Sequence, residues 1–315
     1  MKMEINIEEM YNEIEKLRKK CNGKVALFLI RYKAGAPLFY KPHIQQEVQE
    51  ELLDIFLDEF KNTAKRNVNQ EEYDFVINNN DINYITNKDK FVETNNFFSK
   101  LEDENNHIKE LKKLAINQVF AYSVRVKLET DNYLYFFGSF KNLAKIKKGK
   151  VIGNLKKNEL VSLESNSVLG LDGNIKLLFW ENDILIRQTR FFEKLCDLSK
   201  LYKNESQKVL KVISEYAVIE NMTRLTELAN ENILIARRLT KLNSDPERVK
   251  NFFKNVENVE KVLQDEKFND KFTGITYVDK KLNYDENEPN KFITLIADAA
   301  YESIVGKEKR IDKGL

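Results

Sequence analysis

The sequence has few of the residue types that build metal and nucleophile sites. Its 315 residues include two cysteines, Cys21 and Cys196, and two histidines, His43 and His107. Neither cysteine has a CxxC partner, which argues against a structural zinc site, and no serine or cysteine motif accompanies the histidines. Two isolated cysteines are typical of a protein from a reducing compartment. We therefore expect idle thiols and no cofactor.

Several sequence signals are also absent. There is no GxxxxGK[ST] and no GxGxxG, which removes the common nucleotide-binding loops. The first ten residues, MKMEINIEEM, are acidic and lack the order of a basic stretch followed by an apolar stretch that marks a signal peptide. The longest apolar run near them, Val25 to Ile30, is far shorter than the roughly 20 residues that span a bilayer. These features predict a cytoplasmic protein that reaches a membrane only through a partner.

Charge is abundant but nearly balanced, with 52 basic and 50 acidic residues. Against this background one stretch, Leu134 to Lys157, carries seven lysines and no Asp or Glu: Lys141, Lys145, Lys147, Lys148, Lys150, Lys156 and Lys157. Such a stretch can follow a phosphate backbone, and lysine rather than arginine favours contacts that do not read sequence. Arg187 and Arg190 are further candidates for the same role. The alternative is that the lysines protect a sheet edge from aggregation in a Lys-rich chain.

Hydrophobic periodicity predicts an α+β fold in three parts. Residues 1–115 form an N-terminal α/β part, with a buried strand at Val25 to Tyr32 and an amphipathic helix at Ile44 to Phe60. Residues 116–196 contain short strands with tight turns, which favours a mostly antiparallel sheet that carries the basic loop. Residues 197–315 are mainly helical.

In the helical part, five residues are spaced as a short heptad seam: Leu225, Leu228, Asn232, Ile235 and Leu239. Such a seam builds either a homodimer, with Asn232 fixing its register, or the core between two helices of one chain. Downstream, Asp245 and Pro246 predict a helix start, because Asp is a good N-cap and Pro suits the first helical position.

Two acidic features suggest other functions. The helix at Ile44 to Phe60 has an outer face of acids, which is either solvated or a docking surface for a basic partner. That face consists of Glu47, Glu50, Glu51, Asp54, Asp58 and Glu59. A metal nuclease would need clustered carboxylates, for which the nearest set is Asp172, Glu181 and Asp183. These three lie in predicted turns, where acids are common for other reasons.

The run FFGSFKNLAKIKKGK, followed by LGLDGNIKLLFWENDILIRQTRFFEKLC and a long helical half, resembles the KwaB family of the Kiwa anti-phage defence system. The similarity extends over most of the chain. It implies a cytoplasmic DNA-binding effector that self-associates into dimers and works with a membrane-embedded partner, KwaA, against phage DNA replication and late transcription. We expect a non-enzymatic protein recruited to the inner membrane face, with a metal nuclease and a protein-binding adaptor as alternatives.

If the lysine stretch carries DNA binding, replacing Lys147, Lys148 and Lys150 by Glu lowers DNA affinity and flattens its dependence on salt, because fewer counterions are released. A salt titration of DNA binding by the purified protein measures both effects. A folded triple variant with unchanged affinity and salt slope would rule out this assignment.

Overall fold

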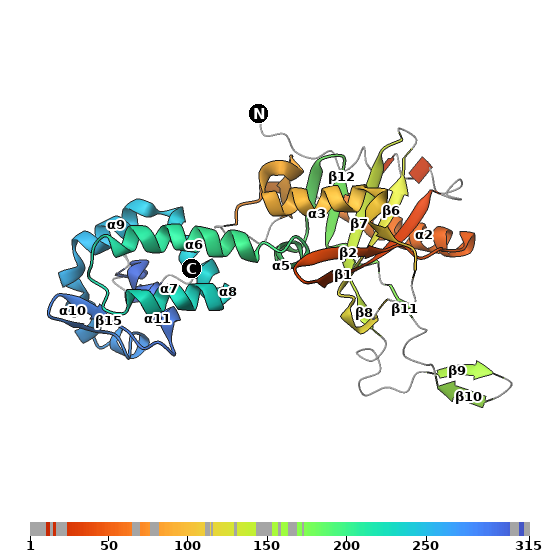
Figure 1. Ribbon diagram of the computed structural model, residues 1–315. Coiled ribbons are helices and arrows are strands. Elements are labelled where there is room, and N and C mark those ends of the chain that lie inside the picture. Colours follow the sequence, from red (N-terminus) through yellow and green to blue (C-terminus); the bar gives the residue numbers. More distant parts are fainter. Residues whose placement is uncertain are drawn as a thin grey trace. The chain divides into compact units, whose positions relative to one another are not determined.

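The computed structural model describes most of the chain in two compact units. The described residues are 11–12, 15–16, 24–64, 70–75, 82–110, 114, 116–128, 131–142, 153–156, 159–162, 169–171, 173–302 and 309–311. Unit 1 comprises Met1–Tyr73 and Asn80–Asp197, and unit 2 comprises Asp74–Asn79 and Leu198–Leu315. In Figure 1 the sheet belongs to unit 1 and the helices α6 to α11 belong to unit 2.

Unit 1 is built on a nine-stranded sheet in the order β3-β4-β13-β12-β7-β6-β1-β2-β5. Neighbouring strands are antiparallel except for the outermost pairs, β3 with β4 and β2 with β5, which are parallel. The strands are β1 (Val25–Lys33), β2 (Ala36–Tyr40), β3 (Gln70–Glu72), β4 (Ile82–Ile85), β5 (His107–Ile108), β6 (Ala121–Lys127), β7 (Tyr133–Ser139), β12 (Leu177–Trp180) and β13 (Asp183–Ile186). Strands from both of the first two predicted parts therefore pair in one sheet.

Local turn chemistry sets the hairpins of this sheet. Ala34 and Gly35 have φ values of 50° and 76° in the turn between β1 and β2, and Asp131 has a φ of 64° between β6 and β7. Strands β6 and β7 form one of these hairpins and are antiparallel, with Val126 opposite Leu134. The predicted mostly antiparallel sheet in an α+β fold is confirmed.

Both faces of the sheet are covered by helices (Figure 1). On one face, Phe56 of α2 (Gln46–Ala64) stacks on Phe136 of β7 at a ring-centroid distance of 5.3 Å. On the other face, Phe98 of α3 (Val92–Glu102) lies 6.0 Å from Phe137, the next residue of β7. Successive residues of a strand point to opposite faces. This explains why β1, with sequence VALFLIRYK, is apolar almost throughout.

Unit 1 also contains two small sheets and several short helices. Strand β8 (Lys141–Asn142) pairs with β11 (Leu169–Gly170), and β9 (Gly153–Lys156) pairs with β10 (Glu159–Ser162). Among the described residues of the unit, further helical elements are α5 (Thr189–Leu195) and the 3-10 turns η1 (Lys88–Lys90), η2 (Glu104–Asn106) and η4 (Ile116–Gln118).

Unit 2 is mainly helical, as predicted for the C-terminal region. Its helices are α6 (Ser199–Ser214), α7 (Met222–Glu231), α8 (Ile233–Lys241), α9 (Pro246–Lys254), α10 (Val259–Gln264) and α11 (Pro289–Ile296), with the 3-10 turns η5 (Leu242–Ser244), η6 (Val256–Asn258) and η7 (Asn269–Lys271). Two hairpins complete it, β14 (Thr276–Val278) with β15 (Lys281–Asn283) and β16 (Ala300–Glu302) with β17 (Lys309–Ile311). The predicted start of α9 is confirmed, since the Asp245 side chain accepts a hydrogen bond from the Arg248 backbone N–H at 3.0 Å.

The heptad pattern in unit 2 does not form one continuous helix. Asn232 separates α7 from α8, and its side-chain oxygen accepts a hydrogen bond from the Leu234 backbone N–H at 2.9 Å, so it is the N-cap of α8. Leu225, Ile235 and Leu239 are buried in the core of unit 2, and Leu228 packs partly buried against that core. These apolar side chains are thus used within the unit. Homodimer formation stays a prediction that cannot rest on them.

We expect Asn232→Leu to lower the free energy of unfolding by about 1 kcal/mol, because α8 loses its cap, whereas Asn232→Ser retains a capping oxygen and most of the stability. Urea unfolding followed by circular dichroism compares the two variants. A buried asparagine of a dimer seam would behave oppositely, with a gain of stability on substitution by leucine.

Candidate anion-binding site

Most of the predicted DNA-binding lysines cannot be placed. Lys145, Lys147, Lys148, Lys150 and Lys157 lie outside the described residues. For the two others, the backbone is described: Lys141 pairs with Gly170 between β8 and β11, and Lys156 pairs with Glu159 between β9 and β10. The lysine stretch as a DNA-binding surface stays a prediction.

The two predicted arginines differ in their surroundings. Arg187 follows β13, and its Nη1 lies 2.8 Å from Oε1 of Glu59 on α2, so its charge is matched within unit 1. Arg190 is exposed in the first turn of α5. The structure does not bring these two side chains into one described site.

The predicted acidic face of α2 is largely exposed. Five of its six acids have exposed side chains, namely Glu47, Glu50, Glu51, Asp54 and Asp58. The sixth, Glu59, is the partner of Arg187.

The carboxylates considered for a nuclease are not seen as a cluster. Asp172 lies outside the described residues, and Glu181 accepts a hydrogen bond from Asn132 at 2.6 Å. Burial, and then the charge of Glu181, raise the pKa of Asp183. Within the described ranges, no three His, Cys, Asp or Glu side chains come close enough to hold a metal ion together.

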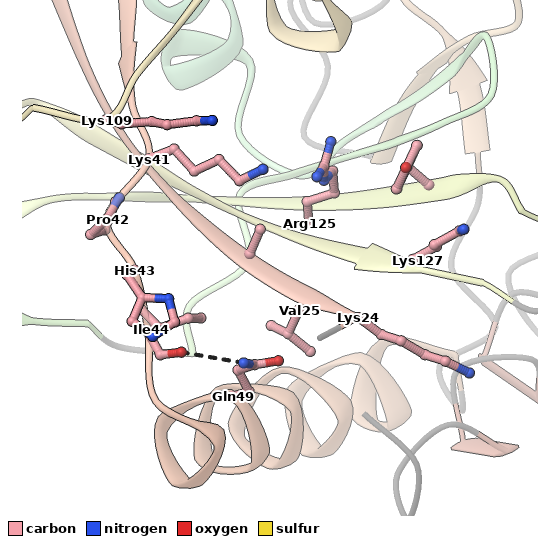
Figure 2. A pocket seen from close by; sticks show the side chains of 12 residues that line it. Lys24, Val25, Lys41, Pro42, His43, Ile44, Gln49, Lys109, Arg125 and Lys127 are labelled. Carbon is pink, nitrogen blue, oxygen red and sulfur yellow. Dashed lines mark hydrogen bonds between the residues drawn. The ribbon is translucent and has the colours of Figure 1, made fainter. Parts of the chain in front are cut away.

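A basic hollow of about 420 Å³ lies at one end of the sheet in unit 1. Figure 2 shows its lining, with the side chains of Lys41 and Lys109 beside each other and Arg125 near the end of Lys41. The basic lining residues are Lys24, Lys41, Lys109, Arg125 and Lys127; the others are Val25, Ala26, Pro42, His43, Ile44, Gln49 and Tyr133. None of these twelve described residues is acidic.

The hollow lies beside the first residues of β1, which β2 does not pair with. Strand β2 pairs with β1 from Leu29 onward, so the earlier residues of β1 have only β6 as a partner strand. The chain leaves β2 at Lys41 and passes through Pro42 into α2. Val25 and Ala26 of β1 line the hollow along this part of the strand.

The five basic side chains reach the hollow from four different parts of the fold. Lys24 precedes β1, Lys41 follows β2, and Lys109 follows β5. Arg125 and Lys127 are two residues apart on β6 and therefore point to the same face. This spacing was the one local signal of the site in the sequence, and sequence reasoning missed it because the other bases are distant along the chain.

Arg125 is more buried than Lys41 and Lys127. Its side chain is 10% exposed, against 26% for Lys41 and 42% for Lys127. Its guanidinium carbon lies 4.3 Å from the ring centre of Tyr133 and 5.5 Å from that of Phe28. Cations over aromatic faces are stabilised by the ring quadrupole. The two rings therefore hold the guanidinium in place at the inner side of the hollow.

One carboxylate partly offsets this positive charge. Oε1 of Glu104 lies 3.4 Å from Nη2 of Arg125 and 3.9 Å from Nζ of Lys41. The charge of Lys41, followed by that of Arg125, lowers the pKa of Glu104. Burial and the charge of Arg125 lower the pKa of Lys41, and Glu104 acts in the opposite direction.

The outer part of the hollow is also basic. Lys127 forms an ion pair with Asp131 at 2.7 Å, and both side chains are well exposed. The 19-residue helix α2 begins at Gln46 beside the hollow, where Ile44 and Gln49 line it. The N-terminus of a helix carries a partial positive charge. Five bases therefore line the hollow and α2 begins next to it, with Glu104 paired to Arg125 and Lys41, and Asp131 paired to Lys127.

Together the fold and the hollow define an α+β protein with a basic concave surface. The family model described as Kiwa protein KwaB-like matches residues 116–306, which is more than half of the chain. The chain therefore belongs to the Kiwa protein KwaB-like family, whose members are components of the Kiwa anti-phage defence system. No curated protein and no solved structure matches the chain.

The matched residues run from just before β6 through nearly all of unit 2. They include Arg125, Lys127 and Tyr133 of the hollow, whereas Lys24, Lys41 and Lys109 precede them. In the part of the chain that the structure describes, no helix is both long and apolar enough to cross a membrane.

Because Glu104 favours the charged form of Lys41, we expect Glu104→Gln to lower the pKa of Lys41 further. NMR titration of the lysine side chains in protein labelled with ¹³C-lysine measures it. Lys127 serves as the internal control, since the hydrogen bond and charge of Asp131 raise its pKa. An unchanged Lys41 pKa in the variant would show that the carboxylate does not act on the amine.

Proposed function

We propose that the chain is a DNA-binding effector of the Kiwa defence system that holds the phosphate backbone largely without sequence preference and does not cleave it. The observation that carries this proposal is the convergence of five basic side chains on a hollow with no acidic lining residue. Family membership supports the role in defence.

The chemistry of the hollow suits phosphate rather than base recognition. Four of its five bases are lysines, which act as point charges, and only Arg125 presents a planar fork of donors. Contacts to phosphates position a protein on DNA but carry no sequence information. The lysine stretch between Leu134 and Lys157 belongs to the same unit and would add further contacts of this kind.

We further propose that the protein acts with the membrane-embedded partner KwaA, which recruits it from the cytoplasm to the inner membrane face, and that it forms homodimers. The exposed acids of α2 support a docking role for this helix, because a row of carboxylates complements a basic cytoplasmic surface. Docking through α2 is also the basis of the alternative, an adaptor that does not contact DNA itself.

Reversing three bases of the hollow tests the proposal. We expect Lys24→Glu, Lys109→Glu and Lys127→Glu together to weaken DNA binding and to flatten the plot of log affinity against log salt by about 0.9 for each phosphate that the protein no longer neutralises. Fluorescence anisotropy with a duplex of random sequence, measured over a range of salt concentrations, gives both quantities.

The matched control reverses three exposed lysines of unit 2, Lys200 and Lys211 on α6 and Lys254 on α9. It makes the same change in net charge, so an equal loss of affinity in both triple variants would mean that bulk charge rather than the hollow governs binding. Incubation of the wild-type protein with plasmid and linear DNA in Mg²⁺ or Mn²⁺ supplies the cleavage test. Cleavage would overturn the non-enzymatic part of the proposal.

A further inference from the structure

Glu104 is not a lining residue of the hollow, but its carboxylate shows where an anion can be held against the two inner bases, Arg125 and Lys41. Oε1 of Glu104 is the one oxygen shared by the two inner bases, with Nη1 and Nη2 of Arg125 both at 3.4 Å and Nζ of Lys41 at 3.9 Å. These distances are long for charge-assisted hydrogen bonds, which are usually about 2.7–2.9 Å. The Glu104 side chain is also 69% exposed. The carboxylate is therefore loosely held and can leave.

The two bases themselves are fixed. Arg125 lies between the rings of Tyr133 and Phe28, and Nζ of Lys41 lies 5.9 Å from the centre of the same Phe28 ring. Phe28 is fully buried in β1. A ligand that replaces Glu104 would meet a preorganised pair of cations, which reduces the entropy lost on binding.

The backbone next to Glu104 allows its side chain to move alone. Glu104 is the first residue of the turn η2, to which it contributes its backbone carbonyl as acceptor for the His107 N–H, whereas the side chain that caps the turn is that of Asp103. The Asp103 carboxylate accepts hydrogen bonds from the Asn105 backbone N–H at 3.0 Å and from the side chains of Asn105 and Asn106. Displacement of the Glu104 carboxylate therefore leaves the fold of η2 intact.

The size and charge of the hollow indicate which anion it takes. A volume of about 420 Å³ is at the small end for ligand sites and suits one nucleotide. Each backbone diester of a DNA duplex carries a single negative charge. A phosphate monoester at the end of a strand or on a free nucleotide can enter, and its second negative charge matches the excess of bases.

We propose that the hollow binds a terminal phosphate, and that Glu104 occupies the position of one phosphate oxygen until the phosphate displaces it. Arg125 binds two phosphate oxygens through its two Nη groups, and Lys41 binds a third or shares one. The inference rests on the proposed function in that it takes nucleic acid as a source of the phosphate; a free nucleotide is the other source.

The test measures binding of a short oligothymidylate, labelled at its 3′ end, that carries either a 5′-phosphate or a 5′-hydroxyl. We expect the wild-type protein to prefer the phosphorylated oligonucleotide about tenfold, as the loss of a charge-assisted pair predicts. Lys41→Gln should remove most of this preference. Glu104→Gln should increase affinity for the phosphorylated form about threefold to tenfold, because no carboxylate competes with it.

Glu47→Gln is the matched control for Glu104→Gln. It removes one negative charge in the first turn of α2, at a position close in sequence to the lining residues Ile44 and Gln49. It leaves the carboxylate beside Arg125 and Lys41 in place. An equal gain of affinity in both variants would overturn the displacement of Glu104, since general electrostatic attraction would then explain it. Competition by thymidine monophosphate, with thymidine as its control, tests the free nucleotide as the source.

The two proposals fail in different ways. Equal binding of phosphorylated and hydroxyl ends by the wild-type protein, with no competition by thymidine monophosphate, overturns the terminal-phosphate site; binding of circular DNA would then leave the proposed function standing. Specific competition or binding by thymidine monophosphate, without affinity for any DNA, overturns the proposed function and supports a nucleotide site.

Discussion

The burial of both faces of the nine-stranded sheet is the constraint on which unit 1 depends. Helix α2 packs through Phe56 on one face, and α3 packs through Phe98 on the other. Successive residues of β7, Phe136 and Phe137, supply the partners on the two faces, so neither face of the central strands is solvated. Charged residues can then be placed only near strand ends and at sheet edges. Arg125 and Lys127, in the last three residues of β6, follow this rule.

The hollow is a consequence of where strand pairing stops. Because β2 leaves β1 after five paired positions, the first residues of β1 border an open space instead of a strand. A guanidinium that is nearly buried at this place loses hydration, and stacking on Tyr133 and pairing with Glu104 offset the loss. The positive charge at this place is not fully offset, because burial and the charge of Arg125 lower the pKa of Lys41. Excess positive charge in a concave, partly buried site attracts anions more strongly than the same charge on a flat surface.

The excess of positive charge in the hollow gives the family assignment a physical meaning. The chain as a whole is close to neutral, with a net charge of +2, so bulk attraction cannot account for the affinity for phosphate that we propose. A local concentration of positive charge can account for it. The hollow and the lysine stretch are such concentrations, and both belong to unit 1. In unit 2, Arg224 forms ion pairs with Glu227, Glu231 and Glu286. These concentrations of charge are the reason why we assign the proposed phosphate binding to unit 1.

Local patterns explain how much of the fold was predictable. The apolar run of β1, the stripe of α2, the hairpin of β6 and β7 and the capped start of α9 all depend on residues close together in sequence. The heptad spacing around Asn232 left two interpretations open, a homodimer or a core between helices of one chain, and the structure places its apolar residues in the core of unit 2. Two short helices joined by a capping asparagine bury the same leucines and isoleucines as a continuous helix would.

By itself the sequence determined the antiparallel α+β fold, the helical C-terminal region and the family resemblance, because periodicity, turn residues and sequence runs are local properties. Only the tertiary structure decided the composition of the hollow. Its bases lie between residues 24 and 127, and they meet because β1 pairs with β6 in one register and β2 departs at Lys41. Such a meeting depends on contacts between distant residues, which no spacing within the sequence records.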